Sequence, residues 1–307
     1  LGASKKLEEV KIASSFESNI EIQLRKITFF LRSRVHEVPL EDDSSFYLLE
    51  VITNSKESLE AMKGTITCIE YDRIDLAYQK QINLKTGKLV GLEALLRLRD
   101  EDGNIIPNDK FIPLIEGESL FSLVVMSSLQ KLKKAFELKN EFNMDGVTIY
   151  LNVSAHTAMQ DNFTKIFADF VKDLSLKPGE LGLEITETAE LEDVKKAGES
   201  FQKLKDIGIP LAIDDFGAGY SSLSYLRDLP VDSVKLDKVF AKTISEKTTS
   251  ELIKFVVSVC DTLSLNMLGE GIETDDQKEK FIKIGCPNGQ GYLMHRPEFI
   301  EDLKKSL

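Results

Sequence analysis

From about residue 76 onward, short apolar runs alternate along the chain with longer amphipathic stretches. The runs have the length of buried strands, whereas the stretches between them place apolar residues at helical spacing. The eight predicted strands are Leu76–Leu84, Leu89–Leu98, Val147–Val153, Leu181–Thr186, Leu211–Ile213, Ser233–Leu236, Asn266–Leu268 and Gln290–Leu293. Residues 85–88 separate the first two strands and are too few for a crossover helix, so this pair is predicted to be antiparallel.

Helices are predicted in the gaps between the other strands. One apolar face runs through Phe163, Ile166, Phe167, Phe170, Val171 and Leu174, and another runs through Leu191, Val194, Phe201 and Leu204. Buried strands that alternate with helices are typical of α/β proteins, and this number of repeats favours a closed barrel over an open sheet. The sequence therefore predicts an α/β fold, a (β/α)8 TIM-like barrel, over residues 71–307.

Residues 1–70 have a different pattern and carry no evident chemistry. Apolar residues recur near helical spacing among charged neighbours, which predicts one long amphipathic helix. These residues are Leu7, Val10, Phe16, Ile20, Leu24, Ile27 and Leu31. A short strand is predicted over Phe46 to Thr53, and a further helix over Ser58 to Glu70. We interpret residues 1–70 as an N-terminal helical or linker segment, either a partner-contacting helix or the remnant of an upstream domain.

Composition and charge narrow the class of protein. No run reaches the roughly 18 apolar residues of a membrane span. The three cysteines are scattered and form no CxxC pair, which indicates a reducing cytoplasm and no disulfide framework. The net charge of −12 argues against binding a nucleic acid polymer through a basic face. Because the chain begins with Leu1, we interpret it as a fragment whose upstream sequence could contain further domains or a membrane tether.

Polar residues recur within or just after strands two to seven. They are seven acids, one amide and one lysine: Glu93, Asn152, Glu184, Glu187, Asp214, Asp215, Lys235, Glu270 and Glu273. In a barrel the carboxyl ends of the strands converge on one mouth, so these side chains are expected to gather there. Carboxylates held close together repel one another and resist burial, so the group requires cations or protons between its members.

The donor atoms indicate which metal would fit. The candidate ligands are all oxygen donors, and the three histidines are isolated in the sequence. Such ligands suit Mg²⁺ or Mn²⁺, and also Ca²⁺, and argue against zinc. The adjacent Asp214 and Asp215 indicate a bridged pair of ions, an arrangement that activates water and stabilises the leaving oxygen of a phosphodiester. Arg97, just past the second strand, offers a fork of donors for a phosphate.

Each of these residues also has an ordinary interpretation. A single Glu after a strand is often a helix cap or a surface residue. The segment 214–219 can be a glycine-rich turn with no further role. Lys235, however, lies between Val234 and Leu236 in a predicted buried strand, where an ammonium needs acidic neighbours. A shared role is the better interpretation because six strands each contribute a polar residue.

Short motifs appear along the chain in a definite order. Glu93-Ala94-Leu95 is followed by Leu96-Arg97, and the later motifs are LNVS at 151–154, EITE at 184–187, DDFGAGYSSL at 214–223, DSVKLD at 232–237, EGIE at 270–273 and QGY at 290–292. The tripeptide alone would occur often by chance, so the ordered series carries the specificity. Over about residues 70–307 the chain resembles the EAL-domain family of c-di-GMP-specific phosphodiesterases.

The resemblance implies a barrel with one antiparallel strand that hydrolyses c-di-GMP to linear pGpG, using two divalent ions, Mg²⁺ or Mn²⁺. The implied metal ligands are Glu93, Asn152, Glu184, Asp214, Asp215 and Gln290, with Asp214 shared between the ions. The implied catalytic residues are Lys235, Glu270 and Glu187, the last as the anchor of the loop at 216–222. The implied substrate-side residues are Gln79, Leu95, Arg97, Asp237 and Glu273, and Asp237 is also expected to position Lys235. Relatives commonly pair, so a homodimer is expected.

One departure from the family pattern and two alternatives stay open at this point. Lys80-Gln81 stands where the family usually has Pro-Ile, which leaves the local substrate edge open. The first alternative is a catalytically inactive receptor that binds c-di-GMP, and a turnover assay with Mg²⁺ or Mn²⁺ separates it from an enzyme. The second, from the residues alone, is an enolase-type barrel in which a lysine abstracts a proton. The paired Asp214 and Asp215 favour the phosphodiesterase.

Overall fold

The computed structural model describes residues 14–24, 27–39, 45–51, 56–115, 119–160, 162–186, 194–218 and 223–307. The chain divides into two compact units. The first comprises Leu1–Arg73 and Leu98–Val124, and the second comprises Ile74–Arg97 and Val125–Leu307.

The second unit is built on a closed ring of eight strands. In chain order these are β4 (Ile74–Asn83), β5 (Leu89–Arg99), β7 (Thr148–Ser154), β8 (Leu181–Thr186), β9 (Leu211–Phe216), β10 (Ser233–Leu236), β11 (Asn266–Gly269) and β12 (Asn288–Gly289). Strands β5 and β7 to β12 pair in parallel, whereas β4 is antiparallel to β12 and closes the ring by pairing with β5. The predicted TIM-like barrel with one antiparallel strand is confirmed.

The eighth strand lies earlier than the sequence predicted. It spans Asn288–Gly289 rather than Gln290–Leu293, and Gly289 pairs with Gly269 of β11. From Gly291 onward the chain packs against the backbone of Ile272, leaving no room for a Cβ at Gly291. The chain therefore leaves the sheet at Gln290, which places that side chain at the end of the barrel.

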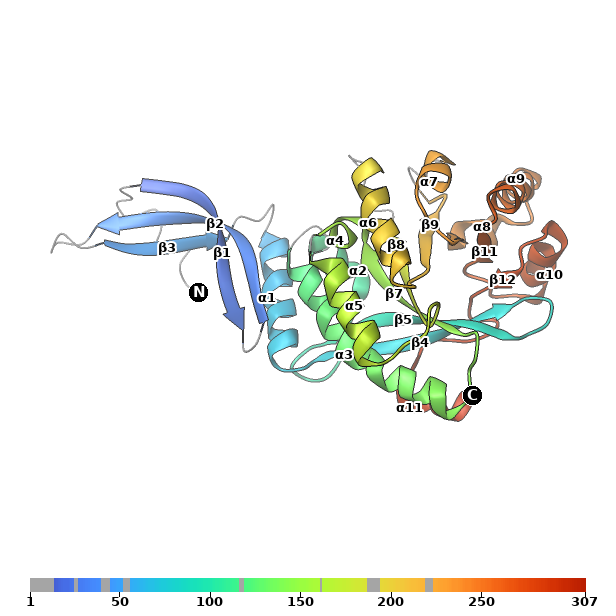
Figure 1. The fold of residues 1–307 in the computed structure, drawn as a ribbon, viewed down its shortest axis with the longest axis horizontal. Coiled ribbons are helices and arrows are strands. Elements are labelled where there is room, and N and C mark those ends of the chain that lie inside the picture. Colours follow the sequence, from blue (N-terminus) through green and yellow to red (C-terminus); the bar gives the residue numbers. More distant parts are fainter. Residues whose placement is uncertain are drawn as a thin grey trace. The chain divides into compact units, whose positions relative to one another are not determined.

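Helices follow the strands and lie outside the ring (Figure 1). They are α3 (Ser119–Glu141), α4 (Ala155–Ala158), α5 (Phe163–Asp173), α6 (Val194–Asp206), α7 (Leu223–Asp228), α8 (Lys238–Thr243), α9 (Lys247–Leu263), α10 (Asp275–Ile284) and α11 (Ile300–Ser306). The predicted apolar faces are buried: Phe167 on α5 and Phe201 on α6 are fully enclosed. Leu191 lies outside the described residues. A two-residue strand, β13 (Glu298–Phe299), pairs with β4.

The first unit corrects the N-terminal prediction, because the expected long helix is a three-stranded antiparallel sheet. Its strands are β1 (Ser14–Leu24), β2 (Ile27–Pro39) and β3 (Ser45–Val51). The physical reason is that apolar and polar residues alternate from Asn19 to Leu24, which is the period of a β-strand and not of a helix. In the sheet, Ile20 pairs with Leu31 and Ile22 pairs with Phe29. Leu7 and Val10 lie outside the described residues.

The remaining elements of this unit agree better with the sequence. The predicted strand near Phe46 to Thr53 and the predicted helix near Ser58 to Glu70 are confirmed as β3 and as α1 (Lys56–Glu70). The unit also contains β6 (Ile105–Ile106), which pairs with the end of β5, and α2 (Asn108–Ile115).

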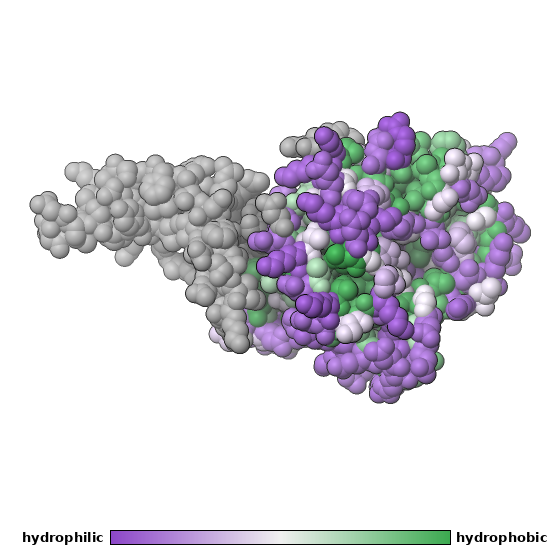
Figure 2. Space-filling model, viewed as in Figure 1, coloured by the Kyte–Doolittle hydropathy of each residue, from purple (hydrophilic) through white to green (hydrophobic). Residues whose placement is uncertain are grey.

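Hydrophilic residues cover much of the barrel face seen in Figure 2, and hydrophobic side chains show between them. Within the part of the chain that the structure describes, no helix has the length and apolar character needed to cross a membrane.

Candidate metal centre

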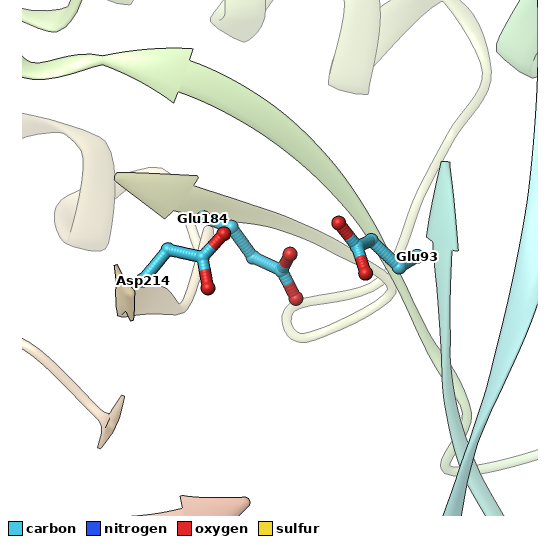
Figure 3. Close-up of side chains that lie close together, drawn as sticks. All are labelled: Glu93, Glu184 and Asp214. Atoms are coloured by element: carbon cyan, nitrogen blue, oxygen red, sulfur yellow. The ribbon is translucent and has the colours of Figure 1, made fainter. Parts of the chain in front are cut away.

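Buried polar side chains gather inside one end of the barrel. Glu93, Glu184, Asp214, Lys235 and Gln290 come from four different strands and from the residue after β12, and each is at most 6% exposed. Figure 3 shows the carboxylates of Glu93, Glu184 and Asp214 pointing toward one another. Branched apolar residues normally fill barrels of this kind. This end of the interior is therefore organised for chemistry and not for packing.

Lys235 is the cation at the centre of this cluster. Its Nζ lies 2.6 Å from Glu184 Oε2, 2.8 Å from Glu270 Oε1, 2.9 Å from Asp214 Oδ1 and 3.6 Å from Glu93 Oε2. Burial lowers the pKa of Lys235, but the surrounding carboxylates outweigh burial and hold this pKa well above its usual value. One ammonium faces four carboxylates, so the cluster retains an excess of negative charge.

The buried carboxylates have shifted pKa values. Burial, together with the neighbouring carboxylates, raises the pKa of Glu184 and of Asp214, even though Lys235 opposes the shift. The same causes raise the pKa of Glu270 to about 8. Such groups are stabilised by taking up a positive charge, whether a proton or a metal ion.

Amide groups hold Glu93 in place. Asn152 Nδ2 donates to Glu93 Oε1 at 2.7 Å, and Gln290 Nε2 donates to Glu93 Oε2. Burial raises the pKa of Glu93, but Lys235 and these two amides outweigh burial and lower it overall. The other end of the Gln290 amide, Oε1, is buried and has no hydrogen-bond partner in the described part of the chain. A buried acceptor left without a donor is free to bind a cation.

A β-bulge brings two adjacent aspartates to the same site. Val234 pairs with Ile213 and Leu236 with Phe216, so Asp214 and Asp215 together oppose the single residue between them on β10. Asp215 has a φ of 51°, in the left-handed region that Asp tolerates better than most residues. Neighbouring residues of a regular strand would point to opposite faces. The bulge removes that restriction.

Two sets of carboxylates have a geometry that could hold a metal ion. Glu93, Glu184 and Asp214 form one set, Asp214, Asp215 and Glu270 form the other, and within each set the oxygens lie within 4.8 Å of one another. Asp214 belongs to both sets, and it is the residue that the family resemblance implied as shared between two ions. The oxygen donors and the unpaired Gln290 Oε1 fit Mg²⁺, Mn²⁺ or Ca²⁺.

Other predicted residues lie at the edge of the cluster. Gln79 is buried, and both ends of its amide are engaged: Nε2 donates to the carbonyl of His295, and Oε1 accepts from Gln290. Asp237 accepts from the backbone N–H of Val239 at 2.7 Å and thereby caps α8. Burial, with the nearby charges of Asp214 and Asp237, raises the pKa of Asp215 to about 6.

The remaining predicted residues differ in position. Leu95 and Arg97 on β5 are partly exposed, and Arg97 Nη1 donates to the carbonyl of Leu96. Glu273 is exposed in the segment after β11. Glu187 lies outside the described residues, as does part of the glycine-rich segment, residues 219–222.

Gln81, which the sequence analysis named only as a departure from the family pattern, contacts the cluster. This side chain is 4% exposed, and its Nε2 donates to Glu184 Oε1 at 2.8 Å. By contrast, Lys80 Nζ lies near the surface and donates to the carbonyl of Ser306. The alternation of inward and outward positions along β4 places Gln81 on the same side as Gln79, which was the available signal.

The chain is similar to proteins of known family. The EAL domain profile matches residues 62–297. The cyclic di-GMP phosphodiesterase PdeA of Borreliella burgdorferi is 30% identical over 292 residues, which cover 94% of this chain and 43% of PdeA. This chain therefore spans less than half of that relative.

Solved structures agree with the sequence comparison. The PaMucR phosphodiesterase in complex with c-di-GMP has a TM-score of 0.74 at 28% identity, covering 80% of this chain and 99% of that one. Klebsiella pneumoniae BlrP1, solved with calcium and cyclic di-GMP, has a TM-score of 0.64 at 25% identity, covering 74% of this chain and 56% of that one.

Proposed function

The chain belongs to the EAL domain family, and from that premise we propose that it hydrolyses cyclic di-GMP to linear pGpG by water attack on a phosphodiester, with two divalent ions, Mg²⁺ or Mn²⁺. One observation carries the proposal: two sets of carboxylates share Asp214 around a single buried lysine. Two ions bound close together are suited to the in-line displacement of a phosphodiester. The names of PdeA and PaMucR support the choice of substrate.

The metal ligands follow from the donor set. Glu93, Asn152, Glu184 and Asp214 hold the first ion in this proposal, and Asp215 and Gln290 join Asp214 at the second. The burial of Glu184 and the unpaired Gln290 Oε1 support both residues as ligands. The Gln290 amide also donates to Glu93, so Gln290 lies beside the first set of carboxylates as well. When bound, the ions would act as Lewis acids on the phosphoryl oxygens and make a bound water easier to deprotonate.

Lys235 and Glu270 act on the attacking water and the developing charge. The two side chains lie 2.8 Å apart, so a water placed against them donates to Glu270 Oε1 and accepts from Lys235 Nζ. The Lys235 ammonium also offsets the negative charge that builds on the phosphoryl oxygens. Three residues that are partly or fully exposed are assigned to contact the substrate: Leu95, Arg97 and Glu273. Asp237, which caps α8, supports Lys235. Gln79 supports Gln290 through the hydrogen bond between their side-chain amides. Glu187 keeps its proposed role as the anchor of the following loop.

The direct test is incubation with c-di-GMP and Mg²⁺ or Mn²⁺, followed by chromatography of the products. The expected product is pGpG. A chelator should abolish hydrolysis and added Mg²⁺ or Mn²⁺ should restore it, whereas Ca²⁺ should support turnover poorly because its coordination is larger and looser. Full activity after exhaustive chelation would contradict the two-ion proposal. Tight binding of c-di-GMP without turnover under any ion would favour the receptor alternative.

We also propose that the chain forms a homodimer. Leu252 and Phe255 lie three residues apart on α9, so they share one face of that helix, and they are 51% and 52% exposed. Val239 on the neighbouring α8 is 43% exposed. Apolar side chains exposed together in this way are typical of a protein–protein contact.

A further inference from the structure

Both carboxylate oxygens of Glu184 are held by side chains. Lys235 Nζ binds Oε2 at 2.6 Å, and Gln81 Nε2 donates to Oε1 at 2.8 Å. Glu184 is fully buried and Gln81 is 4% exposed, so water does not compete freely for either contact. A buried carboxylate with both oxygens engaged has a defined orientation.

The barrel is built to accommodate Gln81. Gly91 on β5 has no side chain, and a Cβ at that position would collide with Gln81 Oε1. The amide therefore lies against β5 at its oxygen end and reaches Glu184 on β8 at its nitrogen end. Gln81 on β4 thus links three strands across the interior of the barrel.

The space below Glu184 is not filled by packed side chains in the described part of the chain. A cavity of about 410 Å³ lies under the cluster, and both Gln81 and Glu184 line it. Most of the remaining lining comes from the starts of the parallel strands, including Thr148 and Ser233, so the cavity extends from Glu184 toward the opposite end of the barrel interior. An unfilled space cannot hold a carboxylate in one orientation by packing.

We infer that Gln81 is a positioning residue for Glu184. By holding Oε1, it keeps the carboxylate plane fixed, with Oε2 against Lys235 within the carboxylate cluster. The inference rests on the proposed function, because it requires Glu184 to be a metal ligand. The family usually has an apolar residue at the position of Gln81. The proposed positioning role therefore applies only to a chain that has Gln at this position. Groups that orient metal ligands typically alter metal affinity 10- to 100-fold when removed.

The test measures Mn²⁺ affinity by calorimetry, without substrate, on wild-type protein and on Gln81→Met. Methionine keeps the length of the side chain and removes the N–H donor. The expected result is a loss of Mn²⁺ affinity of about tenfold or more. Thr148→Val is the matched control, because Thr148 lines the same cavity and donates to the carbonyl of Gly179 at 2.7 Å but does not contact Glu184. Its Mn²⁺ affinity should equal that of the wild type.

A second variant guards against misfolding. Gln81→Ile also removes the donor, and a β-branched residue is well suited to a strand such as β4. Both Gln81 variants should lose Mn²⁺ affinity by a similar factor. The inference is overturned if either folded variant binds Mn²⁺ as the wild type does, or if Thr148→Val loses as much affinity. Wild-type protein that binds Mn²⁺ but does not hydrolyse c-di-GMP would overturn the proposed function. The Mn²⁺ affinities of the wild type and the Gln81 variants would still decide whether Gln81 positions Glu184. Wild-type protein that binds no Mn²⁺ would overturn both.

Discussion

At the scale of single residues, Lys235 is a buried cation surrounded by carboxylates. It is 2% exposed, and four carboxylates lie within 3.6 Å of its ammonium. Such a group has two physical roles that must be separated. It neutralises its acidic neighbours in the folded state, and it can stabilise charge that develops only during the reaction. The first role affects stability and metal content, and the second affects the rate of the chemical step.

Lys235→Ala tests these roles. We expect the variant to retain c-di-GMP binding and to lose hydrolysis by about a hundredfold or more, the scale of removing one preorganised charge from a transition state. The measurement combines single-turnover rate, substrate affinity and metal content on one sample. A stable, metal-loaded variant with near-normal turnover would exclude a catalytic role. A rate loss that follows lost metal would assign Lys235 to charge neutralisation alone.

At the scale of elements, position in the fold decides how much a charged pair contributes. Lys139 on α3 is 4% exposed and binds Glu180, the residue before β8, at 2.6 Å. Glu180 also accepts from the backbone N–H of Lys177. Lys254 and Glu251 on α9 form a pair of similar length, 2.8 Å, but both side chains are more than half exposed. The first pair connects two elements in a partly desolvated place, whereas the second lies in water.

Lys139→Met should therefore lower the free energy of unfolding by about 2 kcal/mol. Lys254→Met is the control and should change it by less than about 0.5 kcal/mol. Urea denaturation of both variants checks the difference. Equal effects of the two substitutions would show that the burial of Lys139 does not matter.

The same pair predicts a pH dependence. Burial raises the pKa of Glu180, but the hydrogen bonds from Lys139 and from the Lys177 backbone outweigh burial and lower it overall. A lowered pKa contributes stability that is fully present above the ordinary pKa of a glutamate, and that stability is lost as the pH falls through the lowered value. Wild-type protein should therefore lose more stability than Lys139→Met as the pH falls below the ordinary pKa. Parallel stability curves for the two proteins in that range would contradict this prediction.

At the scale of the whole molecule, the exposed apolar side chains of α9 predict an assembly. Phe255→Asp should convert a homodimer to a monomer, because a buried unpaired carboxylate at the contact is costly. Light scattering across a range of concentrations measures the change. Ile105→Asp is the control, since Ile105 is similarly exposed, at 44%, but belongs to β6. A wild-type protein that is fully active and stays monomeric at all concentrations would contradict the proposed homodimer.

Local patterns were sufficient for seven of the eight barrel strands and for the residues that meet in the acidic cluster. Strands β8 and β10 have the predicted bounds, because short apolar runs between helices report directly on buried parallel strands. The same reasoning failed in β1 and β2, where helical spacing was read from a set of apolar residues that omitted Ile22 and with it the alternation. A strand can be mistaken for a helix when the apolar residues considered fit both the period of two residues and the period of 3.6 residues.

The sequence by itself determined the fold class and the residues of the acidic cluster, because strand periodicity and the order of the motifs are properties of the chain. Only the tertiary structure decided which atoms meet. The bulge that lets Asp214 and Asp215 share a site depends on pairing with β10, and the contact between Gln81 and Glu184 joins residues 103 positions apart. Such contacts arise when the barrel closes. Closure depends on the register of all eight strands together, and no local stretch of sequence contains that information.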